Sequence, residues 1–210
     1  MRTILFLLFY MLLNGCSSTR LIKHWRNPDY IDFKPKNVLV IGVNPNMELR
    51  KSFERELQKN LNERKINALQ STMVFDELFQ NANLTESELE SQIEKLAANK
   101  FDAILISAVI GSNEYVSYAS KSPKADYQFK KSLGYYLLLR DTFYQEKFYE
   151  SYEVYEIQTL LYRVSINANR VLVWSANYEL IDPKNTEKTI NNYIHTILIS
   201  LEKEGFVSKK

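Results

Sequence analysis

The cysteine at position 16 is the residue with the clearest chemical meaning in this sequence. It ends the tetrapeptide Leu-Asn-Gly-Cys, which follows an uninterrupted apolar run at residues 4–13 with Arg2 before it. A positive charge, a short apolar segment and a small residue before cysteine are typical of a lipoprotein signal peptide that is cleaved at the cysteine. We therefore predict that residues 1–15 are removed and that Cys16 carries a diacylglycerol, with a further acyl chain on the new N-terminus.

Two other interpretations of this segment fit less well. A membrane-spanning helix needs about 20 apolar residues, and this run is too short. An ordinary secretory signal would leave Cys16, the only cysteine, unpaired in an oxidising compartment. Ser17 and Ser18 follow the cysteine, whereas an inner-membrane retention signal has Asp there. This resemblance to lipoprotein sorting signals predicts a protein anchored in the outer membrane through Cys16, facing the periplasm.

Motifs for enzyme chemistry are missing from the rest of the sequence. His24 and His195 stand in unlike settings, and no zinc-protease, nucleophile-elbow or phosphate-loop motif is present. Ser200 and Lys203 match the Ser-x-x-Lys spacing of penicillin-interacting enzymes without the companion motifs, so we interpret them as exposed helix positions. We expect no catalytic residue, no cofactor and no metal. The alternative is a periplasmic hydrolase with acids such as Asp102 or Asp141.

A binding cleft is predicted from topology instead. Open parallel sheets bind ligands beyond the carboxyl ends of their strands. Here those ends would gather a set of small polar side chains: Asn44, Asn46, Ser71, Ser107 and Ser112.

The composition indicates one globular domain. With residues 1–15 removed, 26 basic groups face 25 acidic ones, and this balance offers no electrostatic footprint for nucleic acid. The chain is 45% hydrophobic, which suits a single core at this length. We divide it into a signal peptide (1–15), a lipidated tether that docks on the domain (16–36) and an α/β domain (37–208).

The first half of the domain alternates strands and helices. Apolar runs at residues 38–41 and 101–106 predict buried strands, and a shorter strand is expected at 67–71. Apolar residues every four positions predict a helix at 47–64, and a capping box predicts another at 85–99. This rhythm predicts an open sheet with right-handed crossovers.

The last third predicts a hairpin and a helix. Strands at 154–166 and 171–180 flank turn residues, and an apolar helical stripe then ends at Gly205. On the second strand we expect one buried face, made of Leu172, Trp174, Ala176, Tyr178 and Leu180. The predicted fold class is thus α/β with an open mixed sheet, β-α-β-α-β, then an insertion, an antiparallel hairpin and a C-terminal helix.

The insertion at residues 112–150 is rich in tyrosine. Its aromatic side chains either pack on the sheet or form a docking surface for an envelope protein or a cell-wall glycan, because tyrosine is enriched at interfaces. The predicted partner surface consists of Tyr115, Tyr118, Tyr127, Tyr135 and Tyr136.

Most of the mature chain resembles a group of uncharacterised bacterial lipoproteins of the outer-membrane type. The likeness is carried by the lipidation motif, the pattern Trp25-x-x-Pro28-x-Tyr30, the tyrosine-rich insertion and the hairpin with its Leu-Val-Trp-Ser segment at 172–175. The resemblance implies no assigned reaction. We therefore predict a lipid-anchored envelope protein with a non-enzymatic binding or assembly role.

Overall fold

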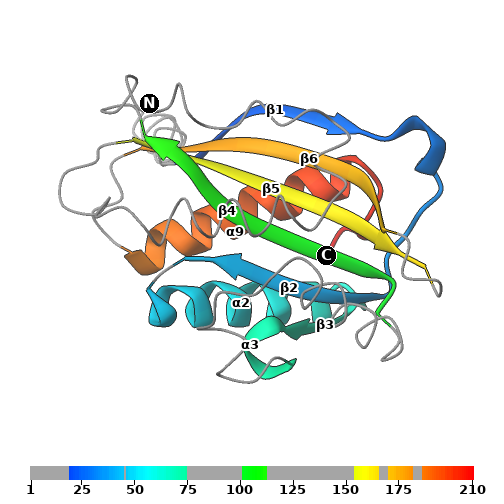
Figure 1. The fold of residues 1–210 in the computed structure, drawn as a ribbon, viewed down its shortest axis with the longest axis horizontal. Coiled ribbons are helices and arrows are strands. Elements are labelled where there is room, and N and C mark those ends of the chain that lie inside the picture. Colours follow the sequence, from blue (N-terminus) through cyan, green and yellow to red (C-terminus); the bar gives the residue numbers. More distant parts are fainter. Residues whose placement is uncertain (1–18, 45, 75–100, 113–153, 166–169, 182–185) are drawn as a thin grey trace, which may run out of the picture.

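The computed structural model describes residues 19–44, 46–74, 101–112, 154–165, 170–181 and 186–210. They form an open, mixed, six-stranded sheet in the order β1-β6-β5-β4-β2-β3, and Figure 1 shows the two long helices on the same side of it. The predicted α/β class, its antiparallel hairpin and its C-terminal helix are confirmed. The predicted helix at 85–99, and the insertion beyond Ser112, lie outside the described residues.

The parallel half of the sheet is built around β2 (Asn37–Val43). It pairs in parallel with β3 (Asn67–Gln70) on one side and with β4 (Ala103–Ser112) on the other. Its six residues after the first are all buried, which explains the continuous apolar run. Helix α2 (Met47–Asn62) connects β2 to β3, and the short α3 (Ser71–Val74) follows β3.

Helix α2 begins and ends where its sequence dictates. The Asn46 side chain accepts hydrogen bonds from the backbone N–H groups of Glu48 and Leu49, at 3.0 and 3.1 Å. Such an N-cap satisfies two donors that the helix itself leaves free and is worth about 1 kcal/mol. After the helix, Lys65 adopts a positive φ of 64° and the N–H of Ile66 returns to the carbonyl of Leu61. The chain therefore turns directly into β3.

The antiparallel half comprises β5 (Val154–Val164), β6 (Arg170–Ile181) and α9 (Thr186–Lys203). β5 pairs with β4 on one side and with β6 on the other. Helix α9 ends at Lys203, and the φ of +75° at the nearby Gly205 lets the N–H of Phe206 reach the Leu201 carbonyl at 3.0 Å. This places Phe206 back on the core.

The N-terminal edge strand was not predicted. Residues assigned to the tether form β1 (Thr19–Arg26), which runs antiparallel to β6, followed by the 3-10 turn η1 (Pro28–Tyr30). Asn27 fixes this connection, since its backbone N–H and side-chain amide both donate to β6 carbonyls. Trp25 and Tyr30 are partly buried against the core, as expected of a docked segment.

Each face of the sheet carries its own apolar cluster. The face covered by α2 and α9 holds the fully buried Trp174 and Tyr178 with the helix residues Leu57 and Ile197. The opposite face holds Leu39, Ile104 and Leu160, among others.

The predicted buried face of β6 is confirmed for Trp174, Ala176, Tyr178 and Leu180, and it is wrong for one residue. Leu172 belongs to the opposite cluster and not to that of Trp174. The reason is a register shift: Leu161 pairs with Trp174 but Tyr162 pairs with Leu172, so Val173 is an extra residue that reverses the alternation.

Candidate functional site

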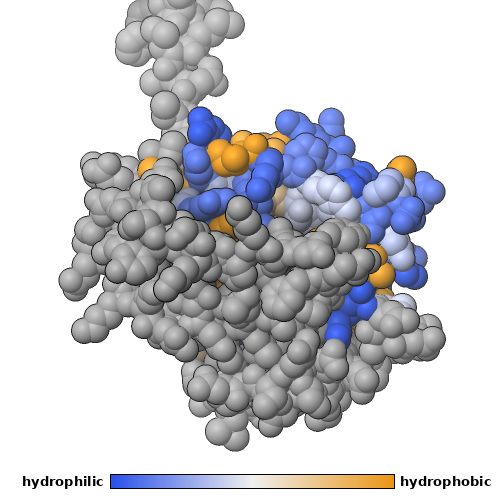
Figure 2. All heavy atoms as spheres, turned by 45° about the horizontal axis from the view of Figure 1, so that its top comes forward, coloured by the Kyte–Doolittle hydropathy of each residue, from blue (hydrophilic) through white to orange (hydrophobic). Residues whose placement is uncertain are grey.

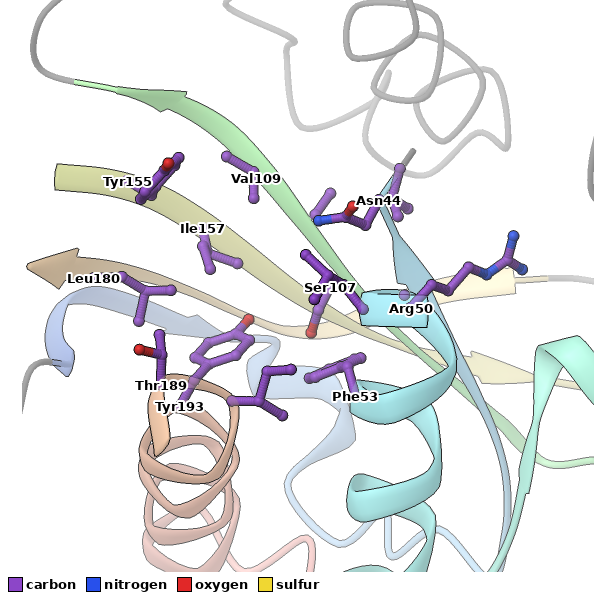
Figure 3. A pocket seen from close by; sticks show the side chains of 15 residues that line it. Asn44, Arg50, Phe53, Ser107, Val109, Tyr155, Ile157, Leu180, Thr189 and Tyr193 are labelled. Atoms are coloured by element: carbon purple, nitrogen blue, oxygen red, sulfur yellow. The ribbon is translucent and has the colours of Figure 1, made fainter. Parts of the chain in front are cut away.

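A pocket of about 190 Å³ lies between the sheet and the first turns of α2 and α9. It sits at the end of the sheet where the parallel strands β2 and β4 have their carboxyl ends (Figure 3). The antiparallel strands complete it, because β5 begins and β6 ends at that same edge. Its wall is mostly apolar and includes Val43, Leu49, Phe53, Ile157, Leu180 and Ile190.

Two polar residues of the lining, Ser107 and Tyr193, are joined through the buried hydroxyl of Thr159, which does not itself line the pocket. Thr159 Oγ1 lies 3.1 Å from Ser107 Oγ and 2.6 Å from Tyr193 Oη, so β4, β5 and α9 are joined by hydrogen bonds. In Figure 3 the Tyr193 ring crosses the pocket with its hydroxyl toward Ser107. The ring is held by stacking on Phe53, with centroids 5.8 Å apart. All three hydroxyls are therefore fixed in place by the fold.

Burial sets the protonation of the pocket tyrosines. It raises the pKa of Tyr193 well above its ordinary value, and the hydrogen bonds from Ser107 and Thr159 offset this only in part. Burial also raises the pKa of Tyr155 at the rim. Both phenols are thus neutral at physiological pH, where they act as hydrogen-bonding groups and not as bases.

A buried charged network lies beside the pocket. Glu54, fully buried on α2, accepts hydrogen bonds from Arg50 Nε at 3.0 Å and from Ser71 Oγ at 2.7 Å. It also accepts from the backbone N–H groups of Gly42 at 2.9 Å and Thr72 at 3.0 Å. Arg50 completes the network by donating to Ser71 Oγ at 2.8 Å. Figure 3 shows the Arg50 guanidinium directed away from the pocket, so its charge pairs with Glu54 and stabilises the fold.

The described lining of the pocket is mostly apolar with a few polar residues. Among the described residues, its lining contains no Asp, Glu, His, Lys or Cys. General acid–base catalysis needs a group that exchanges protons near the working pH, and burial raises the pKa of Tyr155 and Tyr193 away from that range. Within the same residues, no group of three or more His, Cys, Asp or Glu could hold a metal ion.

The five residues predicted for a strand-end cleft are only partly brought together. Asn44 and Ser107 line the pocket. Asn46 caps α2, and Ser71 belongs to the charged network. Ser112 ends β4, and its side chain lies outside the described residues. Cys16 and the five tyrosines of the predicted partner surface lie outside them too.

None of the described residues that were considered for enzyme chemistry lines the pocket. Asp102 lies at the opposite end of β4, where its carboxylate accepts from the backbone N–H groups of Lys36 and Asn37. His24 is half exposed and pairs with Glu204 at 2.9 Å, and His195 is exposed. Ser200 is buried and donates to its own helix, while Lys203 is exposed. Asp141 lies outside the described residues.

Sequence reasoning missed Tyr193 and Arg50, which line the pocket, and Thr159, which joins the hydroxyls of Ser107 and Tyr193. A signal existed for Tyr193, because it lies three positions after Ile190 on the apolar stripe of the terminal helix, where a hydroxyl needs a buried partner. Thr159 and Arg50 carried no such signal.

Comparisons with known proteins give remote structural likenesses. No protein-family model matches this chain, and no curated protein does. The PelC dodecamer from Paraburkholderia phytofirmans is similar over 86% of this chain and 93% of its own, at 11% identity and a TM-score of 0.41. A point variant of the same dodecamer covers 88% and 96%, at 12% and 0.40. Lipoprotein GNA1162 from Neisseria meningitidis covers 80% and 97%, at 12% and 0.40. Similarity this low carries no inference about function.

None of the helices in the described part of the chain is long and apolar enough to span a bilayer.

Proposed function

We propose that this chain is a lipid-anchored envelope protein, held at the periplasmic face of the outer membrane, whose α/β domain binds a ligand or partner without catalysing a reaction. The observation that carries the proposal is the position of β1. This strand begins at Thr19, only three residues after the predicted lipidation site at Cys16. Three residues span at most about 11 Å, so the anchor would hold the start of β1 close to the membrane.

The same geometry gives the domain a direction. Thr19 pairs with Leu180, and Leu180 pairs with Tyr155, so these three residues form one row across the sheet. Leu180 and Tyr155 both line the pocket. An anchor at Cys16 would therefore bring the pocket end of the sheet, and not the Asp102 end, toward the lipid surface.

A binding role is supported by the chemistry of the pocket. Its wall is mostly apolar, its Ser107 and Tyr193 hydroxyls are joined through Thr159, and the nearby charges of Arg50 and Glu54 are paired within the fold. Ligand sites of this kind are apolar clefts with a few fixed polar groups. The tyrosine surface at residues 115–136 stays a prediction for a second, protein or glycan, contact.

The anchor is tested by mass spectrometry of the mature protein together with cell fractionation. We expect an N-terminal Cys16 that carries acyl chains, and a Cys16→Ser variant that leaves the membrane fraction. Ser18→Ala is the matched control, because it changes a neighbouring small polar residue without removing the thiol, and it should stay in the membrane. An unmodified Cys16, or cleavage at another position, would contradict the proposal.

A further inference from the structure

We propose that the strand-end pocket binds the acyl chain of a membrane phospholipid. The apolar character of the pocket is the first support. Side chains from both helices and from strands β2, β4, β5 and β6 meet there, and most of the wall is hydrocarbon. An apolar cavity of about 150 Å³ already accommodates benzene, so the 190 Å³ found here has room for a longer hydrocarbon segment.

The electrostatics of the pocket exclude ligands whose charged group would have to be buried within it. Among the described lining residues, the one with an ionised side chain is Arg50, which is bound to Glu54 and Ser71 and points away from the cavity (Figure 3). Burying a charge that has no partner is costly, so a phosphate or carboxylate cannot sit at the floor of the pocket. The hydroxyl chain is internally bonded and makes no demand on a ligand. An acyl chain fits these conditions while its headgroup stays outside.

The pocket lies at the end of the domain that an anchor at Cys16 would bring to the membrane, and the membrane would be the source of the phospholipid. This step rests on the proposed function, since the membrane is the source only if Cys16 anchors the chain. Cys16 is then within about 11 Å of Thr19, which is one strand away from the pocket residue Leu180. Tethering two sites this closely raises the effective concentration of one at the other.

The large hydrophobic side chains exposed on the described surface are few and lie on different elements. They are Ile22 on β1, Ile31 directly after η1, and Met73 on α3. Figure 2, which brings the β1 side of the molecule forward, shows the described surface there to be mainly hydrophilic with small hydrophobic groups. The pocket is therefore the place where a lipid chain would be retained.

The test is photolabelling of the full-length mature protein in vesicles of phosphatidylethanolamine that has a photoreactive group near the end of one acyl chain. We expect labelled peptides that contain Ile157, Leu180 or Ile190. Val109→Trp, which fills the pocket from β4, should reduce this labelling by about tenfold or more, because each methylene excluded from the pocket loses its burial energy. The matched control is Ile110→Trp, because Ile110 is similarly half buried but packs on the opposite face of the sheet. It should label like the wild type.

Thermal unfolding shows whether each variant is folded. If Val109→Trp does not fold, Ile190→Phe fills the pocket from α9 and should give the same loss. Labelling that is confined to β1, or that is equal in Val109→Trp and Ile110→Trp, would overturn the inference, as would the absence of labelling.

The Cys16→Ser chain, added to the same vesicles, separates the two proposals. If Cys16 is lipidated, the wild type should label its pocket much more strongly than this variant does. If Cys16 is not lipidated, equal pocket labelling in both would reject the anchor and retain the lipid site. A lipidated protein without pocket labelling would reject the lipid site alone.

Discussion

Two polar clusters flank the same pocket and illustrate opposite uses of buried polarity. The network of Arg50, Glu54 and Ser71 is charged, fully paired and turned away from the cavity. The hydroxyl chain of Ser107, Thr159 and Tyr193 is neutral, and its two ends, Ser107 and Tyr193, belong to the cavity wall. The difference teaches that the charged residues beside the pocket stabilise the fold, whereas the pocket wall itself presents mainly hydrocarbon and the neutral hydroxyl groups of Ser107 and Tyr193.

Removing the buried carboxylate should give the largest effect. Glu54→Ala leaves Arg50 buried without a counter-ion and frees the N–H groups of Gly42 and Thr72. Breaking one partner of a buried ion pair costs about 3–5 kcal/mol in the free energy of unfolding. Denaturant unfolding measures this value.

The same helix provides the control for that prediction. Glu56 pairs only with exposed Arg55 and Lys59, at 3.9 and 3.8 Å, so Glu56→Ala should change stability by less than about 1 kcal/mol. The double variant Arg50→Met with Glu54→Leu should be more stable than Glu54→Ala, because no charge is left unpaired. Equal losses in Glu54→Ala and Glu56→Ala would show that the network is not structural.

The sequence predicted the parts of the fold that local patterns encode. Continuous apolar runs located β2 and β4, and four-residue spacing located α2 and the terminal helix. β1 could not be found in this way, because an edge strand needs only one apolar face and its partner β6 lies some 150 residues away. The face of Leu172 was misjudged because a bulge depends on the neighbouring strand and leaves no trace in the alternation itself.

The sequence predicted the location of the pocket in the fold, but only some of the residues that line it. Topology led to Asn44 and Ser107, since both follow or lie near the carboxyl ends of parallel strands. The other wall comes from β5 and α9, whose approach is fixed by long-range packing. Arg50 and Glu54 lie between the apolar residues of the α2 stripe in the sequence, yet they are 4% and 0% exposed. Burial of a charged pair depends on the tertiary partners that satisfy it.

An intermediate effect is expected at Gly42, which links the two clusters. Its N–H donates to Glu54, and a Cβ at this position would lie 3.1 Å from the ring of Phe53, the side chain that stacks on Tyr193. Gly42→Ala should therefore push α2 away from the sheet and cost about 1–3 kcal/mol, as overpacking does. Unfolding measurements check this value. Gly111→Ala is the control, because its Cβ would meet nothing within 4 Å, and an equal loss in both variants would contradict the close packing.

The smallest effect is expected when the hydroxyl chain is shortened at its end. Tyr193→Phe removes one hydrogen bond but keeps the ring on Phe53, and Thr159 still has Ser107 as a partner. Since no buried group is left unsatisfied, the loss in unfolding free energy should be about 1 kcal/mol. Thr159→Val should cost more, because it removes the group that Ser107 and Tyr193 share. Chemical denaturation of both variants, side by side, tests this order. If Tyr193→Phe destabilised the protein as much as Glu54→Ala does, the hydroxyl chain would be as structural as the charged network, and the contrast between the two clusters would be lost.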